Sequence, residues 1–194
     1  MITPMPGKTS ERRLSTAEER RETVLRTALG AFAARGYYGT TTGEVAKSAG
    51  ISQAYVYRLF PDKESLFVAV VEHCFARIRE SLADGVAGAS GSTPEAVLDA
   101  MGEAYARLIA EQRPLLSVQM HAQCAALSEG AVREVVQHGY ARTVEYVRGA
   151  SGADEARVQE FFAKGMLCHL VVAAAADEVD APWARTLSAG IRHY

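Results

Sequence analysis

The sequence has no hydrophobic run long enough to cross a membrane. Its longest nearly apolar stretch, residues 165–176, contains His169 and is shorter than the roughly 20 residues that a bilayer requires. The first 15 residues carry Pro, Lys, Glu and Arg and lack the apolar segment of a secretory signal. The sequence therefore predicts a soluble, cytoplasmic protein.

Cysteine is also scarce, and its pattern excludes a disulfide framework. The three cysteines, Cys74, Cys124 and Cys168, are far apart and each lies in apolar helical sequence, which indicates buried reduced thiols. There is no Gly-rich phosphate loop, no nucleophile elbow and no ligand-spaced Cys/His set. We therefore expect no metal and no cofactor, and an enzyme is the less favoured class.

Positive charge is too limited for a uniformly basic nucleic-acid-binding coat. The 194 residues have a net charge of −2, but residues 1–63 hold 10 Lys and Arg against 6 Asp and Glu, whereas residues 64–194 hold 11 against 17. A basic N-terminal part on an acidic body suggests that only one end of the protein contacts a polyanion. This asymmetry argues against a non-specific architectural DNA-binding protein.

Helical periodicity runs through almost the whole chain, and no segment alternates polar and apolar residues as a strand would. We predict an all-α protein of about nine helices. Thr16 with Glu19 forms a capping box for the first helix, and Gly36 is placed to end it. The predicted parts are a flexible polar tail at 1–15, a three-helix domain at 16–62 and a helical domain at 63–194.

Residues 41–60 carry the clearest motif, a helix-turn-helix. Thr41 opens one short helix and Ser52 caps the next, while Ala46 is small where the helices must touch. Gly50, four residues after Ala46, suits the left-handed turn between them. Three apolar residues are spaced to pin the second helix to a core: Ile51, Val56 and Leu59.

If those apolar residues face inward, the second helix turns a polar face outward. Gln53 can then read an adenine edge, and Ala54 and Tyr55 can approach a thymine methyl. Tyr57, Arg58 and Lys63 suit phosphate contacts, as do the backbone amides after Thr41. The alternative is that Tyr55 and Tyr57 are ordinary surface or core aromatic residues.

The stretch TTTGEVAKSAGISQAYVYRLFPDKESLF, residues 40–67, resembles the DNA-binding domain of the tetracycline-repressor (TetR) family of bacterial regulators. The resemblance spans roughly residues 16–75 and is most specific at Tyr57, Phe60, Lys63 and Glu64. Beyond residue 80 it rests on helix number and length alone.

This resemblance implies a homodimeric repressor that places its third helix in the major groove of a palindromic operator and is released by a small molecule. It implies that Thr42 and Tyr57 contact the DNA backbone, that Gln53, Ala54 and Tyr55 approach bases, and that Lys63 binds phosphate. Together with the helix-turn-helix reasoning above, the candidate DNA-contacting residues are Thr41, Thr42, Ser52, Gln53, Ala54, Tyr55, Tyr57, Arg58 and Lys63. Arg12 and Arg13 form either an arm in the minor groove or part of a solvated tail.

The resemblance also divides the second domain between effector binding and dimerisation. The candidate effector-binding residues are Met101, Tyr105, Met120, His121, Cys124 and Tyr140. The candidate dimer residues are Phe162, Met166, His169, Ala173 and Trp183. Methionines and aromatic residues at helical spacing belong to an ordinary core more often than to a cavity lining. The helix at 153–176 has the same pattern if it is buried within one subunit. The alternative functions are an architectural DNA-binding protein and a helical small-molecule-binding enzyme.

Overall fold

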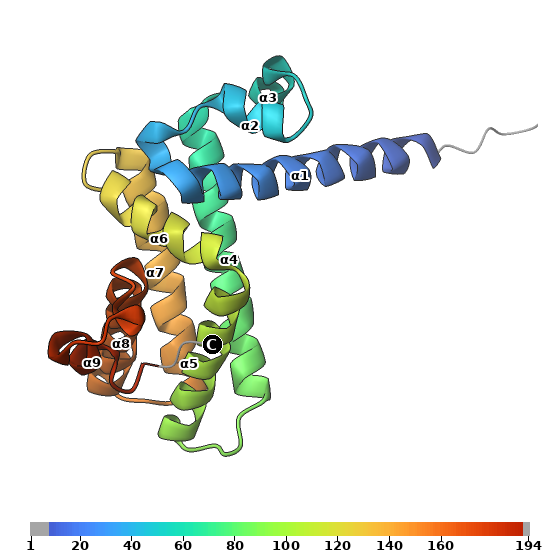
Figure 1. Cartoon of the computed structure of the whole chain (residues 1–194). Coiled ribbons are helices and arrows are strands. Elements are labelled where there is room, and N and C mark those ends of the chain that lie inside the picture. Colours follow the sequence, from blue (N-terminus) through green and yellow to red (C-terminus); the bar gives the residue numbers. More distant parts are fainter. Residues whose placement is uncertain (1–7, 192–194) are drawn as a thin grey trace, which may run out of the picture.

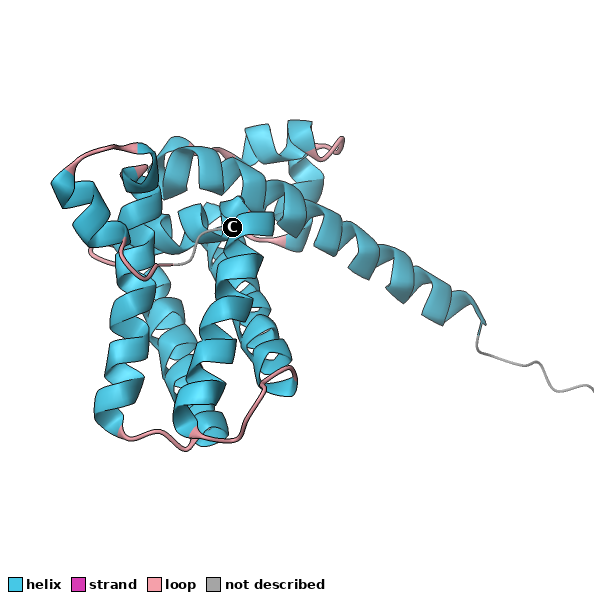
Figure 2. Cartoon of the chain, turned by 60° about the horizontal axis from the view of Figure 1, so that its bottom comes forward, coloured by secondary structure: helices cyan, strands magenta, loops and turns pink. Residues whose placement is uncertain are grey.

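The computed structural model describes the backbone of residues 8–191 and the side chains of residues 18–191. Within these residues the chain forms nine α-helices and one 3-10 turn, with no strand (Figure 2). The all-α prediction is confirmed. No helix in the part that the structure describes combines the length and the apolar character needed to cross a bilayer.

The helices form a small N-terminal unit on one end of a helical body (Figure 1). Helix α4 runs from that unit along the body, where it packs beside α5 and α7. The helices are α1 (Lys8–Gly39), α2 (Thr42–Ser48), α3 (Gln53–Leu59), α4 (Lys63–Ala87), α5 (Pro94–Glu111), α6 (Arg113–Ala125), α7 (Gly130–Ser151), α8 (Glu155–Ala173), η1 (Ala176–Glu178) and α9 (Pro182–Ser188).

Helix α1 begins earlier and ends later than the sequence predicted. It starts at Lys8 rather than at Thr16, because residues 8–16 contain no glycine or proline to interrupt a helix. Gly36 does break the helical geometry, with φ 69° and ψ −176°, but the chain resumes helical turns as far as Gly39. The side chains of Arg12 and Arg13 lie outside the described residues, so the predicted arm stays a prediction.

One continuous core joins the N-terminal unit to the body through α4. The predicted stripe along this helix is buried throughout, at Leu66, Val70, Cys74, Ile78 and Leu82. In the N-terminal unit, Phe32 of α1 meets Phe67 of α4 with ring centroids 4.7 Å apart. Helix α4 is therefore buried in the N-terminal unit and in the body, and the two parts share one core.

The cysteine prediction is right for two residues and wrong for the third. Cys74 and Cys168 are buried free thiols, and burial raises the pKa of Cys74 to about 12. Cys124 is exposed because α6 turns its neighbours Ala122 and Ala125 toward the core and leaves position 124 outside. Among the described side chains, no three His, Cys, Asp or Glu residues lie close enough to hold a metal ion.

Candidate functional sites

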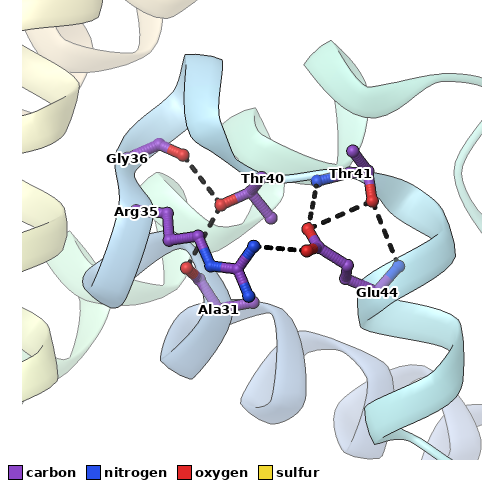
Figure 3. A network of polar contacts seen from close by, with 6 residues as sticks. All are labelled: Ala31, Arg35, Gly36, Thr40, Thr41 and Glu44. Atoms are coloured by element: carbon purple, nitrogen blue, oxygen red, sulfur yellow. Dashed lines mark hydrogen bonds and ion pairs between the residues drawn. The ribbon is translucent and has the colours of Figure 1, made fainter.

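The start of α2 is fixed to the end of α1 by a dense polar network (Figure 3). Thr41 Oγ1 accepts a hydrogen bond from Glu44 N at 3.2 Å, and the Glu44 carboxylate accepts one from Thr41 N at 3.0 Å. Arg35 of α1 forms an ion pair with the same carboxylate. These contacts, the Thr41 backbone bond first, lower the pKa of Glu44 below its usual value, so the network holds at neutral pH.

Thr40, the residue before Thr41, stabilises the kink in α1. Thr40 is buried, and its hydroxyl donates to Gly36 O at 2.8 Å and contacts Ala31 O at 3.1 Å (Figure 3). The hydroxyl therefore supplies a hydrogen bond to backbone carbonyl groups at and before the kink. The kink and the capping box together orient α2 relative to α1.

The two short helices adopt the predicted helix-turn-helix geometry. Gly50 has φ 67°, and Ile51 N donates to Ala46 O at 3.0 Å across the turn. Ser52 caps α3 by accepting from Tyr55 N at 3.2 Å, and Val56 is fully buried beneath it. Both predicted caps and the predicted turn glycine are confirmed.

The outer face of α3 carries most of the predicted DNA-contacting residues. Those that are exposed are Thr41, Ser52, Gln53, Ala54, Tyr57 and Arg58. Thr42, in contrast, is only 5% exposed. Its hydroxyl accepts from Gln53 Nε2 at 3.0 Å and lies 3.0 Å from the Tyr57 hydroxyl. Thr42 therefore positions the Gln53 and Tyr57 side chains from beneath the outer face of α3. This role is in addition to the contact with the DNA backbone that the resemblance implies.

Two arginines of α1 border this face, and sequence reasoning missed both. Arg20 lies 5.7 Å from the centre of the half-buried Tyr55 ring, and Arg58 lies 4.8 Å from it. Arg21 lies 4.3 Å from the Phe60 ring and donates to Leu59 O. The excess of basic residues in residues 1–63 was the available signal, but it did not say which ones reach α3.

Lys63 is half-buried at the start of α4 rather than extended into solvent. Its Nζ donates to Tyr37 O at 3.0 Å and lies 4.4 Å from the centre of the Tyr37 ring. An ammonium group has three donors, so this contact leaves donors for a phosphate. Lys63 therefore links α4 to α1 and stays a predicted phosphate ligand.

A cavity of about 550 Å³ opens in the body between α4, α5, α7 and α8. Of the six residues predicted to bind an effector, Tyr105 and Tyr140 line it. Met101 is buried in the core, Met120 packs against the core from outside, and Cys124 is exposed. The remaining predicted residue, His121, packs against Gly36 instead of lining the cavity.

Three of the predicted dimer residues also line this cavity: Phe162, Met166 and His169. Met166 is nevertheless 44% exposed, and Trp183 on α9 is 50% exposed. Ala173, at the end of α8, is exposed as well. Helix α8 thus forms one wall of the cavity and also presents apolar side chains to the outside.

The cavity contains a cluster of neutral polar groups from three helices. His169 Nε2 lies 2.9 Å from the Tyr105 hydroxyl, which accepts from Gln119 Nε2 at 3.3 Å. Burial raises the pKa of Tyr105 and lowers the pKa of His169, so both side chains are neutral at pH 7. His169 is 5% exposed, and its buried Nδ1 has no hydrogen-bond partner among the described residues.

Comparison with known proteins matches the helix-turn-helix unit to a family. The family described as "Bacterial regulatory proteins, tetR family" matches residues 24–70, which include α2 and α3. This part of the chain is similar to TetR-family regulators. The chain is 41% identical over 59 residues to the nucleoid occlusion factor SlmA of Haemophilus influenzae and 33% identical over 64 residues to the regulator RutR of Escherichia coli.

These two matches cover 30% and 33% of the chain, and 27% and 30% of the relatives. The regulator AcrR of Shigella flexneri is 28% identical over 123 residues, which are 62% of this chain and 57% of AcrR. The chain therefore spans less than two thirds of the length of these relatives.

Solved structures extend the likeness of fold to the helical body. The regulator FadR of Bacillus subtilis, in complex with stearoyl-CoA, superposes with a TM-score of 0.70 at 16% identity, and the match covers 88% of this chain and 94% of FadR. A transcriptional regulator of Pseudomonas aeruginosa superposes with a TM-score of 0.66 at 18% identity. The match covers 89% of this chain and 88% of that regulator. At such identities the comparison shows a shared fold.

Proposed function

We propose that this chain is a transcriptional regulator of the TetR family that reads double-stranded operator DNA with α3. The observation that carries the proposal is the exposed Gln53, hydrogen-bonded to Thr42 and flanked by Tyr57 on the outer face of a helix-turn-helix. Glutamine forms two hydrogen bonds with adenine in the major groove. Flanking tyrosine and arginine side chains suit contacts with the phosphate backbone of the DNA. The match of residues 24–70 to bacterial regulators supports this role.

We further propose that the functional unit is a homodimer formed through α8 and α9. Large apolar side chains of this region are 40–51% exposed: Leu170, Val179, Trp183 and Met166. Exposed large apolar side chains gathered on neighbouring helices support an interface with another chain. A two-fold dimer presents two copies of α3, and a palindromic operator with half-sites about 34–36 Å apart, or multiples of that, is its geometric match.

The cavity in the body is the proposed effector site, and occupation of it releases the DNA. Its volume of about 550 Å³ and its apolar walls with a few polar groups suit a small organic molecule. The FadR structure, of the same fold, was solved with stearoyl-CoA. Helix α4 contributes Phe75, Ile78 and Leu82 to the cavity and also packs in the N-terminal unit, so an effector that displaces α4 changes the spacing of the two α3 helices.

Selection from a random duplex library with the full chain tests the DNA-binding proposal. We expect enrichment of an inverted repeat that binds about 10³-fold or more tighter than unselected DNA in fluorescence anisotropy at 150 mM salt. The readout is repeated at several salt concentrations, since non-specific binding weakens steeply with salt. Equal affinity for selected and random DNA at every salt concentration contradicts the proposal and indicates an architectural DNA-binding protein.

A further inference from the structure

The polar cluster in the cavity is buried and carries no charge. Tyr105 lies between Gln119 Nε2, which donates to its hydroxyl at 3.3 Å, and His169 Nε2, which lies 2.9 Å from the same hydroxyl. Gln119 and His169 are 8% and 5% exposed, and both line the cavity with Tyr105. Burial raises the pKa of Tyr105 and lowers the pKa of His169, so all three side chains are neutral at pH 7.

This polar cluster has hydrogen-bonding capacity that the described residues do not use. The Tyr105 hydroxyl has one proton, which it gives either to His169 Nε2 at 2.9 Å or to Gln119 Oε1 at 3.5 Å. In both arrangements the buried His169 Nδ1 has no partner among the described residues. A buried polar group without a partner is unfavourable, and a ligand that completes the hydrogen bonding of the cluster removes part of that cost.

Aromatic rings form an apolar wall on the same cavity. Phe161, Phe162, Tyr140 and Phe75 follow one another edge to face, with successive centroid separations of 5.6, 6.4 and 5.2 Å. The Phe75 ring lies directly on the backbone of α7 at Gly139, where a Cβ atom would overlap it. Helix α7 therefore supports this ring wall. An aromatic or other flat apolar molecule packs well on such rings, in edge-to-face or offset geometry.

The charged side chains that line the cavity select neither an anion nor a cation. Five of the six are exposed to solvent: Glu95, Asp99, Arg157, Glu160 and Lys164. The two basic residues each form an ion pair with a lining glutamate. The sixth, Glu103, is half-buried and already has an interaction partner. Exposed charges contribute little to binding because water and salt screen them, so the buried neutral groups dominate recognition.

We infer that the effector is an uncharged molecule whose flat apolar body packs on the ring wall and whose carbonyl or hydroxyl oxygen bonds to the polar cluster. This inference rests on the proposed function, because it assigns a chemical class to the ligand of the same effector site. An oxygen of this kind fits because a tyrosine hydroxyl and a neutral imidazole can each donate or accept a hydrogen bond. A charged group at the same place would leave water for a buried site with neutral partners only, which weakens binding.

Three probes of nearly the same size and shape test the assigned class. Isothermal titration calorimetry with the full chain compares the neutral 4-phenylbutan-2-one, the anion 3-phenylpropanoate and the cation 4-phenylbutan-2-ammonium. We expect the ketone to bind about tenfold or more tighter than either ion. If either ion binds as tightly as the ketone, or if the ketone does not bind at millimolar concentration, the inference is wrong.

A variant and a spectrum test the hydrogen bond separately from the charge. Tyr105→Phe removes the central hydroxyl of the polar cluster and should weaken ketone binding about fivefold. The matched control is Tyr146→Phe, which removes a hydroxyl outside the cavity lining and should have no effect. Circular dichroism checks that both variants are folded. Equal ketone affinity of the two folded variants contradicts the inferred hydrogen bond.

The infrared spectrum of the ketone bound to the unmodified chain needs no variant. A hydrogen bond to the carbonyl oxygen lowers the frequency of the C=O stretch, so we expect a lower frequency in the complex than in hexane. A stretch at the hexane frequency would show that the oxygen does not bond to the polar cluster.

The outcome for this inference is separable from the outcome for the proposed function. The same samples are titrated with the selected DNA duplex. DNA binding without a preference for the ketone overturns only the assigned ligand class, whereas absence of sequence-specific DNA binding overturns the proposed function.

Discussion

His121 of α6 packs directly on the backbone of Gly36 at the kink of α1. A Cβ atom built on Gly36 would lie 2.7 Å from His121 Nδ1, closer than side-chain carbons approach in real structures. Gln119, two residues earlier on α6, belongs to the polar cluster of the cavity. A single short helix therefore contacts both the proposed effector site and the helix that carries the helix-turn-helix.

Gly36→Ala should destabilise the protein and uncouple the N-terminal unit from the body. The backbone at Gly36 has φ 69° and ψ −176°, a region used essentially by glycine alone, so any side chain costs about 1–3 kcal/mol before it meets His121. Thermal unfolding and DNA affinity measure the effect. Gly30→Ala is the control, because that position is helical and has nothing within 4 Å, so alanine should be neutral or stabilise by up to about 1 kcal/mol. Equal behaviour of the two variants contradicts the prediction.

The helix-turn-helix was predictable from sequence because its determinants are local. The Thr41 and Ser52 caps act within three residues, and Gly50 fixes the turn through its own backbone angle. Helix α1 was predicted less well, because a favourable cap at Thr16 does not prevent a helix from starting earlier when nothing interrupts it.

The cavity was predicted less completely because it depends on contacts between distant segments. Tyr105, Gln119 and His169 come from α5, α6 and α8, and the pairs they form are 14 and 64 residues apart in sequence. Helical periodicity indicates that His121 and Cys124 lie on an amphipathic helix, but a rotation of one position decides whether a side chain faces the cavity, a neighbouring helix or solvent. Tyr105 and Tyr140 were placed correctly at the cavity, whereas His121 and Cys124 were not.

Gln53→Ala should relax sequence preference at one position of each operator half-site. A bidentate contact with adenine contributes about 1–3 kcal/mol of discrimination, and alanine cannot supply it. Competition among duplexes substituted at each position measures this preference. Thr42→Val retains Gln53 but removes the hydroxyl that holds it, so it should weaken the same preference less. A uniform loss of affinity for all duplexes, whatever the base at each position, would mean that Gln53 contacts the DNA backbone instead.

Lys63→Ala should weaken binding to all DNA sequences about equally and lower the salt slope by about one unit. It should also lower the free energy of unfolding, because Lys63 Nζ bonds to Tyr37 O and lies over the Tyr37 ring. Anisotropy at several salt concentrations and thermal unfolding measure the two effects. Lys164→Ala, on the cavity side of the body, should leave the salt slope unchanged. Loss of stability with an unchanged salt slope would assign Lys63 a structural role only.

Gly85→Ala should separate α4 from α5 and destabilise the body. A Cβ at Gly85 would lie 2.7 Å from Ala100 O and 2.9 Å from Met101 Cα, and neither backbone atom can rotate away. Overpacking of this kind typically costs about 1–3 kcal/mol. Gly149→Ala on α7, where nothing lies within 4 Å, is the control and should not destabilise. Denaturant unfolding compares the two variants, and equal midpoints would show that the helices do not pack this closely.

His169 should make stability depend on pH in the mildly acidic range. Burial lowers its pKa in the folded protein below the usual 6.5, so the unfolded chain binds more protons as the pH falls below that value. The contribution of neutral His169 to the free energy of unfolding is therefore fully present above about pH 6.5 and is lost as the pH falls toward the folded pKa.

Because carboxylates also titrate in acid, the effect of His169 is measured as a difference. The free energy of unfolding of the unmodified chain is compared with that of His169→Gln from pH 7.5 to 5. We expect this difference to shift in favour of His169→Gln as the pH falls, since glutamine takes up no proton on unfolding. A constant difference would mean that His169 is as readily protonated in the folded chain, beside Tyr105, as in the unfolded one.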